Sequence, residues 1–281
     1  GGGTNSMLEL LKRLDCECFQ VTACFYRDYS KGDSSLRKEL AAIGIPLVVL
    51  PLRCQPLWAK LAKELLRGLL AWRKPWRQRA VFAVERLWRI QPRAQALAAL
   101  LRDGNYDLLY MNNQPASNLE GYLAAELAGR PVVQHCRIEP KLNGVERAAV
   151  NRIARCVICV SAGVAEALVA QGVRRDLCRV VYNAIDGQQA LPGPIHLPDV
   201  AAGTPIIGAV GSLIKRKSLD QLLRAVATLD HRPLPHLLLV GEGPEHRTLH
   251  ALAEQLGLAG RITFAGFQKQ PLPWLAAMDI L

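Results

Sequence analysis

A lysine and several glycines between Ile206 and Phe267 have the types and spacing needed to bind an anionic group. The segment reads IIGAVGSLIKRKSLDQLLRAVATL, then HLLLVGEGPEHRTLHALAEQLGL, then RITFAGF. In the first two pieces an apolar strand leads through a glycine turn into an amphipathic helix. This order places backbone N–H groups and a helix N-terminus at the carboxyl edge of a parallel sheet. Lys217 follows the first turn and adds a positive charge. Together these features predict a site for a diphosphate.

Each of these features also has a plain structural interpretation. Gly241 and Gly243 precede Pro244, a common first residue of a helix. They do not form a dinucleotide fingerprint, because His246 stands where G-x-G-x-x-G requires its last glycine. Lys217 could be a solvated lysine in the first turn of a helix, but the helix dipole disfavours a cation there. We therefore predict a functional role for Lys217 and leave both interpretations open for the two glycines.

The composition indicates a globular protein that is long enough for two domains. Of the 281 residues, 50% are hydrophobic and 21% are charged, with a formal net charge of +11. These values differ from those of disordered chains. No apolar run approaches the ~18 residues of a transmembrane helix. The eight cysteines form no framework of spaced pairs. We therefore expect reduced thiols and a cytoplasmic protein.

Cys156 and Cys159 have the spacing of a zinc knuckle but lie within the apolar run CVICV. Residues three apart on a strand point to opposite faces, so these two thiols could not readily share one ion. The sequence offers no second CxxC to complete a zinc site. We interpret the two cysteines as structural and predict neither a metal nor a cofactor.

Strand-like and helix-like runs alternate along the chain, which predicts an α/β fold with mostly parallel, doubly wound sheets. The strand-like runs of the first part are Phe19–Tyr26, Ile45–Leu50, Tyr106–Met111, Pro131–His135, Cys156–Val160 and Cys178–Tyr182. The helical runs are Met7–Leu14, Ser34–Ile43, Ala116–Ala128, Gly144–Ile153 and Ala162–Gln171. Pro and Gly then interrupt the pattern. We expect a first domain at 1–186, a linker at 187–204 and an incomplete second domain at 205–281, whose last strand begins near Met278.

The segment 53–102 is strongly basic. It holds twelve Lys and Arg against two Glu, a difference of ten, and four of the five tryptophans. Pro75 divides it into two expected helices. On the first helix Leu57, Leu61, Leu65 and Leu69 share one face, and Lys60, Lys63, Arg67 and Lys74 share another. This pattern predicts docking on an anionic membrane surface, with a solvated helical excursion as the equally open alternative. Nucleic-acid binding is disfavoured because no recognition motif accompanies the charge.

The glycine and lysine motifs resemble a known family. The run from Gly211 to Lys217 with its following helix, VGEGP at Val240–Pro244 and ITFAGF at Ile262–Phe267 are together similar to the donor-binding half of the retaining GT-B glycosyltransferases of family 4. The resemblance extends thinly over the N-terminal half. It implies two Rossmann-like domains with a nucleotide-sugar site in the cleft between them. It also implies sugar transfer with retention of anomeric configuration and without a metal.

The resemblance implies roles for individual residues of the second domain. Lys217 would stabilise the diphosphate leaving group, and the backbone at Phe267 would face the nucleobase. The other donor-binding residues that the resemblance implies are Gly211, Ser212, Arg216, Gly241 and Gly243. Ser212 stands where the family has an arginine, so Lys215 or Arg216 would have to supply the second charge.

In the first domain the resemblance implies a second set of site residues. His135 ends the strand-like run PVVQH, at the place of a family histidine that faces the reacting sugar. We predict His135 and Lys217 to be the catalytic residues. Gly2 and Gly3 resemble a glycine loop near the donor phosphates. Arg137 and Glu139 follow His135 and are expected to contact the acceptor.

Three further residues resemble family landmarks with structural roles. Ser161 follows the apolar run CVICV, and we expect it to cap the helix that begins after it. Asn183 and Asp186 belong to the sequence VYNAID just before the expected linker. We expect these two side chains to shape the hinge.

The most diagnostic pair of the family is not found in this sequence. It consists of two glutamates, eight residues apart, that hold the sugar and the ribose of the donor. They would fall shortly after Leu281. We therefore expect the chain to be a fragment that lacks its first strand and its C-terminal part, and to be inactive by itself.

The predicted function is transfer of a sugar from a nucleotide-sugar donor to a lipid-linked or saccharide acceptor in the assembly of cell-envelope polysaccharide. The location would be the cytoplasm or, as a peripheral protein, the inner face of the membrane. One alternative is a sugar-nucleotide epimerase of the same fold, which would need acidic residues in the cleft from both domains. The other is a non-catalytic glycosyltransferase-like subunit, which Ser212 in place of arginine favours.

Overall fold

The computed structural model of the protein describes residues 2–31, 34–52, 54–184, 190, 192–230 and 233–281. The chain divides into two compact units, residues 1–184 (unit 1) and residues 185–281 (unit 2). Both units alternate helices with parallel strands, which confirms the predicted α/β class. Of the helices in the described ranges, none is long and apolar enough to cross a membrane.

The main sheet of unit 1 is parallel and has the strand order β5-β6-β7-β8. Its strands are β5 (Leu109–Asn112), β6 (Val132–Cys136), β7 (Ala154–Cys159) and β8 (Cys178–Val180). The remaining strands form two pairs, β1 (Ala23–Phe25) parallel to β4 (Leu47–Val49) and β2 (Ser30–Lys31) antiparallel to β3 (Ser34–Ser35). Because parallel strands end at the same edge of a sheet, residues at the carboxyl ends of β5 and β6 meet there.

Most helices of unit 1 pack on these strands and enclose the core. The helices of unit 1 are α1 (Gly2–Lys12), α2 (Leu36–Ala41), α3 (Leu57–Leu69), α4 (Lys74–Glu85), α5 (Gln91–Asp103), α6 (Leu119–Ala128), α7 (Gly144–Ile153) and α8 (Ala162–Ala170). Fully buried Tyr122, Val150 and Leu168 join α6, α7 and α8 to Val132 and Val157 of the sheet. Each such side chain contributes about 1.5–3 kcal/mol by leaving water.

Local signals in the sequence fix several helix ends of unit 1. The hydroxyl of Ser161 accepts a hydrogen bond from the N–H of Val164 at 3.2 Å, which confirms it as the cap of α8. Asn143 and Glu146 form a capping box at the start of α7. Pro75 lies in the first turn of α4, so it separates α3 from α4 as predicted.

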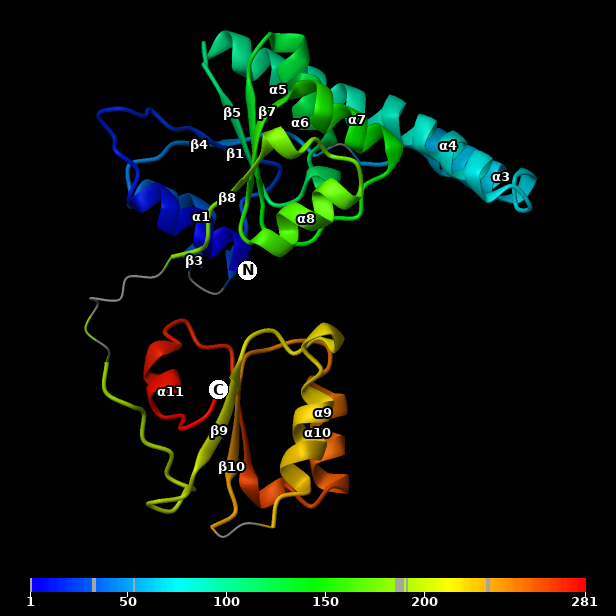
Figure 1. The fold of residues 1–281 in the computed structure, drawn as a ribbon. Helices are drawn as coiled ribbons and strands as arrows, with labels where there is room; N and C mark the ends of the chain where they lie inside the picture. Colours follow the sequence, from blue (N-terminus) through cyan, green and yellow to red (C-terminus); the bar gives the residue numbers. More distant parts are fainter. Residues whose placement is uncertain (1, 32–33, 53, 185–189, 191, 231–232) are drawn as a thin grey trace. The chain divides into compact units, whose positions relative to one another are not determined.

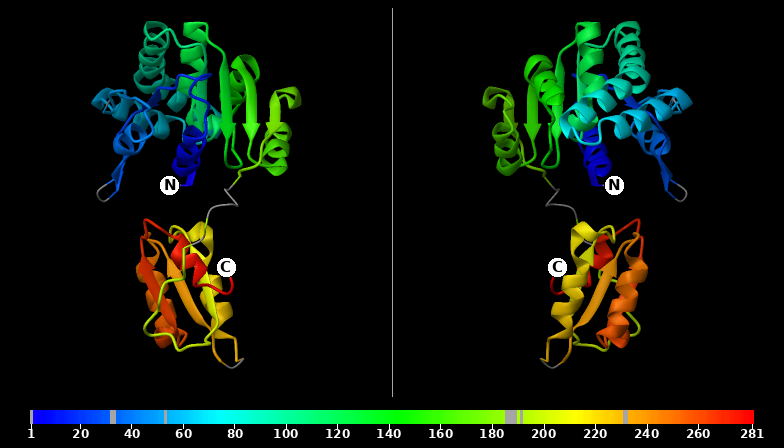
Figure 2. Two further views of the ribbon diagram at one scale, coloured as in Figure 1. Left: turned by 90° about the vertical axis from the view of Figure 1, so that its left-hand side faces the viewer. Right: turned by 90° about the vertical axis from the view of Figure 1, so that its right-hand side faces the viewer.

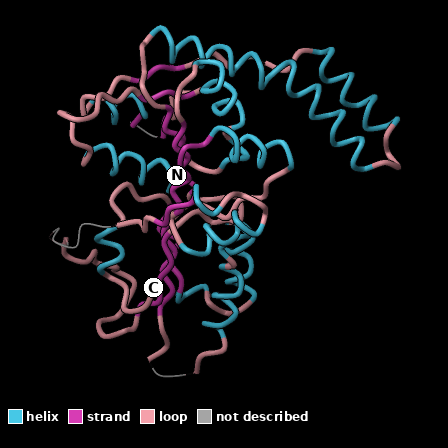
Figure 3. Tube along the Cα trace, turned by 45° about the horizontal axis from the view of Figure 1, so that its top comes forward, coloured by secondary structure: helices cyan, strands magenta, loops and turns pink. Residues whose placement is uncertain are grey.

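Helices α3 and α4 form a pair that projects from the rest of unit 1 (Figures 1 and 3). A short turn, which contains Trp72, joins them. Helix α4 runs on through a π-helical turn at Arg86–Ile90 into α5, which packs against α6. The described part of the basic segment, 54–102, therefore forms an arm with its base in the core of unit 1.

Unit 2 has a parallel sheet with the order β11-β10-β9. Its elements are β9 (Ile206–Val210), α9 (Leu219–Ala227), β10 (His236–Val240), α10 (His246–Gln255), β11 (Ile262–Gly266) and α11 (Leu272–Ala276). Helices α9 and α10 cover one face of the sheet and α11 lies on the other, as Figures 1 and 2 show. Leu237 and Leu239 of β10 pack against Leu223 of α9 and Leu249 of α10.

The linker expected at 187–204 stays a prediction. In its described part, the N–H of Ile195 donates to the carbonyl of Pro273 in α11 at 3.1 Å. One expectation for unit 2 needs correction. The strand expected near Met278 is a single parallel bridge between Ile280 and Ile207. Met278 packs so closely on β9 that a Cβ on Gly208 would lie 2.0 Å from its Sδ.

Candidate functional site

The carboxyl end of β6 carries the predicted histidine of unit 1. The register of the sheet pairs Asn112 of β5 with His135 of β6, and Tyr110 with Val133. Because side chains alternate along a strand, Tyr110, Asn112 and His135 belong to one face of the sheet and Gln134 belongs to the other. The sheet register therefore determines which polar groups surround His135.

His135 is buried, with 8% of its surface exposed. Its Nδ1 is in hydrogen-bond contact with the hydroxyl of Tyr110 and lies 3.4 Å from Nη2 of Arg137. Its Nε2 is buried and has no hydrogen-bond partner among the described residues. Burial, followed by the charge of Arg137, lowers the pKa of His135 to about 4. The imidazole is therefore neutral at pH 7.

Arg137 links the strand ends to α1. Its Nε donates to Oδ1 of Asn112 at 2.6 Å, and its Nη1 donates to Oδ1 of Asn183 at 3.3 Å. Asn112 in turn donates from Nδ2 to the carbonyl of Gly3 at 3.2 Å. A Cβ on Gly3 would lie 3.9 Å from Cδ of Arg137. The structure thus brings together three predicted site residues, Gly3, His135 and Arg137.

Gly2 and Gly3 belong to the first turn of α1 and do not form the loop expected from the sequence. Helix propensity alone disfavours glycine there, so the hydrogen bond from Asn112 to the Gly3 carbonyl helps to offset this cost. The correction leaves an anion-binding role open, because the first N–H groups of a helix have no partner within the helix.

The opposite face of β6 is tied down by Gln134, which is fully buried. Its Oε1 accepts from the hydroxyl of Tyr122 at 3.0 Å and from Nδ2 of Asn118 at 3.2 Å. Its Nε2 donates to the carbonyl of Asn113 at 3.1 Å, just beyond β5. These bonds fix the ends of β5 and β6 against α6, so the residues around His135 sit on a rigid support.

The remaining residues predicted in unit 1 lie apart from this network or outside the described ranges. Glu139 is exposed in the loop after Arg137. Asp186 falls outside the described residues. Sequence reasoning missed Tyr110 and Asn112, and it did not predict the contact of Asn183 with Arg137. The available signal was the alternation of Tyr110 and Asn112 at the end of a strand that precedes the one with His135.

In unit 2 the two predicted glycine turns pack backbone against backbone. Gly211 has φ +148° and Gly241 has φ +146°, a region that side chains rarely allow. A Cβ on Gly241 would lie 1.9 Å from the carbonyl oxygen of Gly211, and one on Gly243 would lie 2.2 Å from that of Leu213. The N–H of Leu213 donates to the carbonyl of Glu242 at 3.0 Å. Glycine is therefore required here by close approach of two chains.

Lys217 lies beside the first of these turns. A Cβ on Gly211 would be 3.6 Å from Cε of Lys217 and 3.9 Å from its Nζ. The lysine ends a short 3-10 turn, Lys215–Lys217, and Ser218 follows with φ +50°. Helix α9 begins only at Leu219, so Lys217 precedes the helix and is not part of its first turn. This position brings an exposed ammonium group to the turn at the carboxyl end of β9.

The other predicted residues of unit 2 are all exposed. Ser212 belongs to the first glycine turn, and Arg216 belongs to the same 3-10 turn as Lys217. Phe267 follows β11 directly, after Gly266 with φ +65°, and 46% of its surface is exposed. Ser212 and Arg216 therefore belong, like Lys217, to the segment that follows β9. Phe267 instead follows β11.

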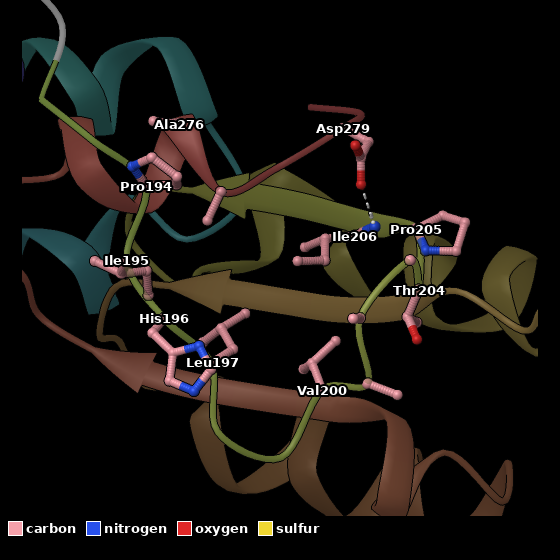
Figure 4. Close-up of a pocket in the computed structure, with 14 residues that line it drawn as sticks. Pro194, Ile195, His196, Leu197, Val200, Thr204, Pro205, Ile206, Ala276 and Asp279 are labelled. Atoms are coloured by element: carbon pink, nitrogen blue, oxygen red, sulfur yellow. Dashed lines mark hydrogen bonds between the residues drawn. The ribbon is translucent and has the colours of Figure 1, made fainter.

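A cavity of about 640 Å³ lies elsewhere in unit 2, between the segment 194–205 and the residues around α11 (Figure 4). Asp279 lies at its rim and accepts a hydrogen bond from the N–H of Ile206 at 2.7 Å. None of the predicted site residues lines this cavity. Within the described ranges, no cluster of three His, Cys, Asp or Glu side chains could hold a metal ion.

Residues 1–189 match the sequence model of Glycosyltransferase Family 4, and residues 204–281 match that of Glycosyl transferases group 1. The chain belongs to glycosyltransferase family 4. The two matches together extend over both units, and they confirm the resemblance predicted from the glycine and lysine motifs.

Two curated relatives illustrate this family membership. Lipopolysaccharide core biosynthesis glycosyltransferase LpsE of Rhizobium meliloti is 35% identical over 125 residues, which cover 44% of this chain and 36% of the relative. The 2-deoxystreptamine glucosyltransferase of Streptomyces kanamyceticus is 28% identical over 200 residues, or 62% of this chain and 51% of the relative. The aligned regions thus span about a third to a half of these relatives.

Solved structures share the fold at low sequence identity. HepE of Anabaena in complex with UDP-glucose has a TM-score of 0.66 and 22% identity, with 99% of this chain and 69% of that chain covered. A glycosyltransferase from Rickettsia africae has a TM-score of 0.68 and 17% identity, with 99% and 68% covered. The predicted GT-B fold of this family 4 chain is confirmed.

Proposed function

We propose that the protein that carries this chain transfers a sugar from a nucleotide-sugar donor to a saccharide or lipid-linked acceptor during assembly of cell-envelope polysaccharide. The observation that carries the proposal is the placement of Lys217 beside the glycine turn at the carboxyl end of β9. Family membership supports glycosyl transfer. The name of LpsE supports an envelope saccharide, and the complex of HepE with UDP-glucose supports a nucleotide-sugar donor.

Lys217 would stabilise the leaving group. As the bond between the anomeric carbon and the diphosphate oxygen breaks, its electron pair passes to that oxygen and negative charge develops there. An ammonium group and backbone N–H dipoles aimed at this oxygen lower the barrier without a metal ion. Gly211, Gly241 and Gly243 would let the chain approach the phosphates, with Ser212 and Arg216 as further contacts and Phe267 near the base.

In unit 1, His135 would contact the transferred sugar, with Gly2 and Gly3 at the N-terminus of α1 near the donor phosphates. Arg137 and Glu139 would contact the acceptor. The acceptor hydroxyl would form its bond to the anomeric carbon on the face that the diphosphate leaves, and its proton would pass to the departing oxygen. This course retains the anomeric configuration.

A titration of the whole protein with UDP-glucose, UDP-galactose and GDP-mannose tests the proposal. We expect one of these donors to bind and Lys217→Met to weaken transfer strongly, while a chelator leaves transfer unchanged. Arg224→Met, which removes an exposed cation from α9, is the matched control. Loss of activity with the chelator would contradict the metal-independent mechanism.

Ser212 supports one competing function, a non-catalytic subunit of the same fold. Its hydroxyl offers a hydrogen bond but no charge, so the diphosphate site holds fewer fixed cations than the family pattern. If no sugar nucleotide binds the whole protein, this alternative replaces both the transferase and the epimerase. Donor binding followed by epimerisation without transfer would favour the epimerase.

The projecting arm supports a second proposal about where the protein works. Four leucines of α3 form an outer row, Leu57, Leu61, Leu65 and Leu69, and each is between 63% and 78% exposed. The face of α3 that points into the protein instead holds Ala59 and Lys63, which are both buried. This arrangement reverses the usual burial of an amphipathic helix. A continuous apolar row of this kind marks an interaction surface.

Ion pairs at the base of the arm explain why α3 has this orientation. Nζ of Lys63 donates to Oε1 of Glu85, and Nε of Arg89 donates to Oε2 of the same carboxylate at 3.0 Å. The Lys63 ammonium also lies 5.6 Å from the ring centre of Trp88. These two contacts hold Lys63 inward, so the outer row faces solvent.

The arm also exposes cations and tryptophans. The exposed cations of α3, α4 and the turns next to them are Lys60, Arg67, Arg73, Lys74, Arg79 and Arg86. Trp58, Trp72 and Trp76 are between 52% and 85% exposed. Tryptophan favours the boundary between lipid and water, and each cation contributes about 1 kcal/mol near anionic headgroups.

We therefore propose that the outer row inserts into an anionic bilayer and makes the protein a peripheral protein of the inner membrane face. Flotation with phosphatidylcholine vesicles, with and without phosphatidylglycerol, tests this. Binding should require the anionic lipid and fall more than tenfold in the double variant Leu61→Glu, Leu65→Glu. Leu127→Glu, at an exposed leucine of α6, is the matched control. Equal binding to neutral vesicles, or a stable dimer that buries the row, would contradict the proposal.

A further inference from the structure

The two ring nitrogens of His135 have unequal surroundings. Nδ1 is shared by two groups, the hydroxyl of Tyr110 and Nη2 of Arg137 at 3.4 Å. Nε2 is buried but has no hydrogen-bond partner among the described residues. A buried polar atom without a partner is uncommon in folded proteins, so it requires an explanation.

The chemistry of Arg137 determines which nitrogen carries the proton. A guanidinium group has five N–H donors and no acceptor. Nδ1 must therefore present its lone pair to Arg137, and the hydroxyl of Tyr110 donates to the same lone pair. The single proton of the neutral imidazole then resides on Nε2. The unpartnered atom is thus an N–H donor in need of an acceptor.

Protonation of both nitrogens is opposed by the same surroundings. A second proton on Nδ1 would point at the N–H groups of Arg137, and the resulting cation would be buried beside the guanidinium. Tyr110 and Arg137 are the titratable groups that act on His135 in the part of unit 1 that the structure describes. Neither provides a negative charge that would favour imidazolium.

We infer that Tyr110 is a positioning residue that, together with Arg137, holds His135 as the neutral Nε2–H tautomer, so that His135 serves its ligand as a hydrogen-bond donor and not as an acid or a base. An oxygen acceptor, such as a hydroxyl of the transferred sugar, is the ligand chemistry that this tautomer recognises. The identity of that ligand rests on the proposed function, whereas the tautomer depends only on unit 1.

The sheet register makes Tyr110 suited to this task. Tyr110 pairs with Val133 and Asn112 pairs with His135, so the Tyr110 side chain precedes Asn112 by one step on the same face. The rings of Tyr110 and His135 are 6.0 Å apart and perpendicular, at 88°. Phenylalanine at position 110 would keep this packing and remove only the hydroxyl.

Long-range ¹H–¹⁵N spectra of the ¹⁵N-histidine-labelled protein test the inference directly. The protein has six histidines, and His135→Gln identifies the signal of interest. At neutral pH we expect the pattern of an Nε2–H tautomer for His135. In Tyr110→Phe we expect a mixture of tautomers, because one of the two donors to Nδ1 is lost. A predominant Nδ1–H tautomer in the wild type, or an unchanged spectrum in Tyr110→Phe, would overturn the inference.

Tyr122→Phe provides the matched control. It removes a buried hydroxyl hydrogen bond from Gln134, the neighbour of His135, on the opposite face of the same strand. The His135 pattern should stay unchanged in this variant. A shift to mixed tautomers in both variants would show that general loosening of the sheet, and not the Tyr110 hydroxyl, sets the tautomer, and it would overturn the assigned role.

Addition of UDP-glucose separates this inference from the proposed function. A shift of the His135 Nε2–H signal on addition supports both. A persistent Nε2–H tautomer that does not respond to any donor upholds the inference and counts against sugar binding by His135. Where transfer is measurable, Tyr110→Phe should lower kcat about tenfold with little change in KM for the nucleotide sugar, because one hydrogen bond is weakened at the reacting sugar.

Discussion

The candidate residues of the two units are organised in opposite ways. In unit 1 the candidate groups are side chains that are bonded to one another, with buried His135 and half-buried Arg137 held through Tyr110, Asn112 and Asn183. In unit 2 the backbone provides the shape, and Lys217 is an exposed side chain placed over it. The unit 1 network favours one orientation of one donor group. The unit 2 turns bring two backbone segments close together beside an exposed ammonium group, and we propose this arrangement as the site of the diphosphate.

The largest expected effect comes from the closest backbone approach. In Gly241→Ala the new Cβ would meet the carbonyl oxygen of Gly211 at 1.9 Å. Because both partners are backbone, neither can move aside cheaply, and we expect a loss of about 3 kcal/mol or more in the free energy of unfolding. Urea unfolding measures this. Gly260→Ala, where a Cβ would meet nothing within 4 Å, should stay near wild type; similar losses in both would contradict the close-packing argument.

Lys217→Met should separate chemistry from stability in unit 2. The side chain is exposed, so unfolding should be almost unaffected. If Lys217 stabilises the leaving diphosphate, kcat for transfer should fall by about 10²–10³. Steady-state kinetics of the whole protein, beside Arg224→Met as control, give the comparison. A change in KM alone would assign Lys217 to ground-state binding.

The buried histidine of unit 1 should make stability depend on pH. Its folded pKa is lowered to about 4, so between the unfolded pKa of about 6.5 and that value the unfolded state binds more protons. Stability is therefore full above pH ~6.5 and falls as the pH drops, by up to about 3 kcal/mol near pH 4. Unfolding curves at several pH values should show a shallower decline for His135→Gln. His196→Gln, at an exposed histidine, is the control. If the unfolding free energy depended equally on pH in the wild type and in both variants, His135 would not be the source of the pH dependence.

The smallest effect concerns the missing charge at position 212. Ser212→Arg would place a second cation next to Lys217 at an exposed turn. We expect nucleoside diphosphate binding to tighten by about 1 kcal/mol, or roughly fivefold, with a steeper dependence on salt. Calorimetric titration with UDP gives the value. Weaker binding would indicate that Lys215 and Arg216 already fill the site.

The turns of unit 2 could be predicted from the sequence because their backbone conformation requires glycine, and glycine is visible in the sequence. Only glycine tolerates the positive φ and close approach found at Gly211 and Gly241. Strand and helix order followed from hydrophobic periodicity. His135 was selected because the resemblance to family 4 implies a histidine at the end of this strand-like run. These features could be recognised from local sequence, without knowledge of which distant residues they contact.

The rest of the unit 1 site could not be predicted because its residues are brought together by tertiary contacts. Tyr110 and Asn112 contact His135 and Arg137 only through the register of β5 against β6, and local sequence does not encode register. Helix α1 begins at Gly2 with a bond from Asn112, more than a hundred residues away, to the Gly3 carbonyl. Periodicity divided α3 into an apolar and a basic face. It could not show that Lys63 is buried against Glu85 while Lys60 and Arg67 of the same predicted face stay exposed.

The tryptophans of the arm in unit 1 can report, by their fluorescence, how deeply each part of the arm enters a bilayer. Trp72 in the turn at its tip is 85% exposed, whereas the indole N–H of Trp88 at its base is buried. Lipids brominated at successive positions along the acyl chain quench a tryptophan according to how deeply it lies. With single-tryptophan versions of the protein, such quenching would tell whether the arm lies flat on the bilayer or dips in tip first. The geometry of docking could thus be read without any attached label.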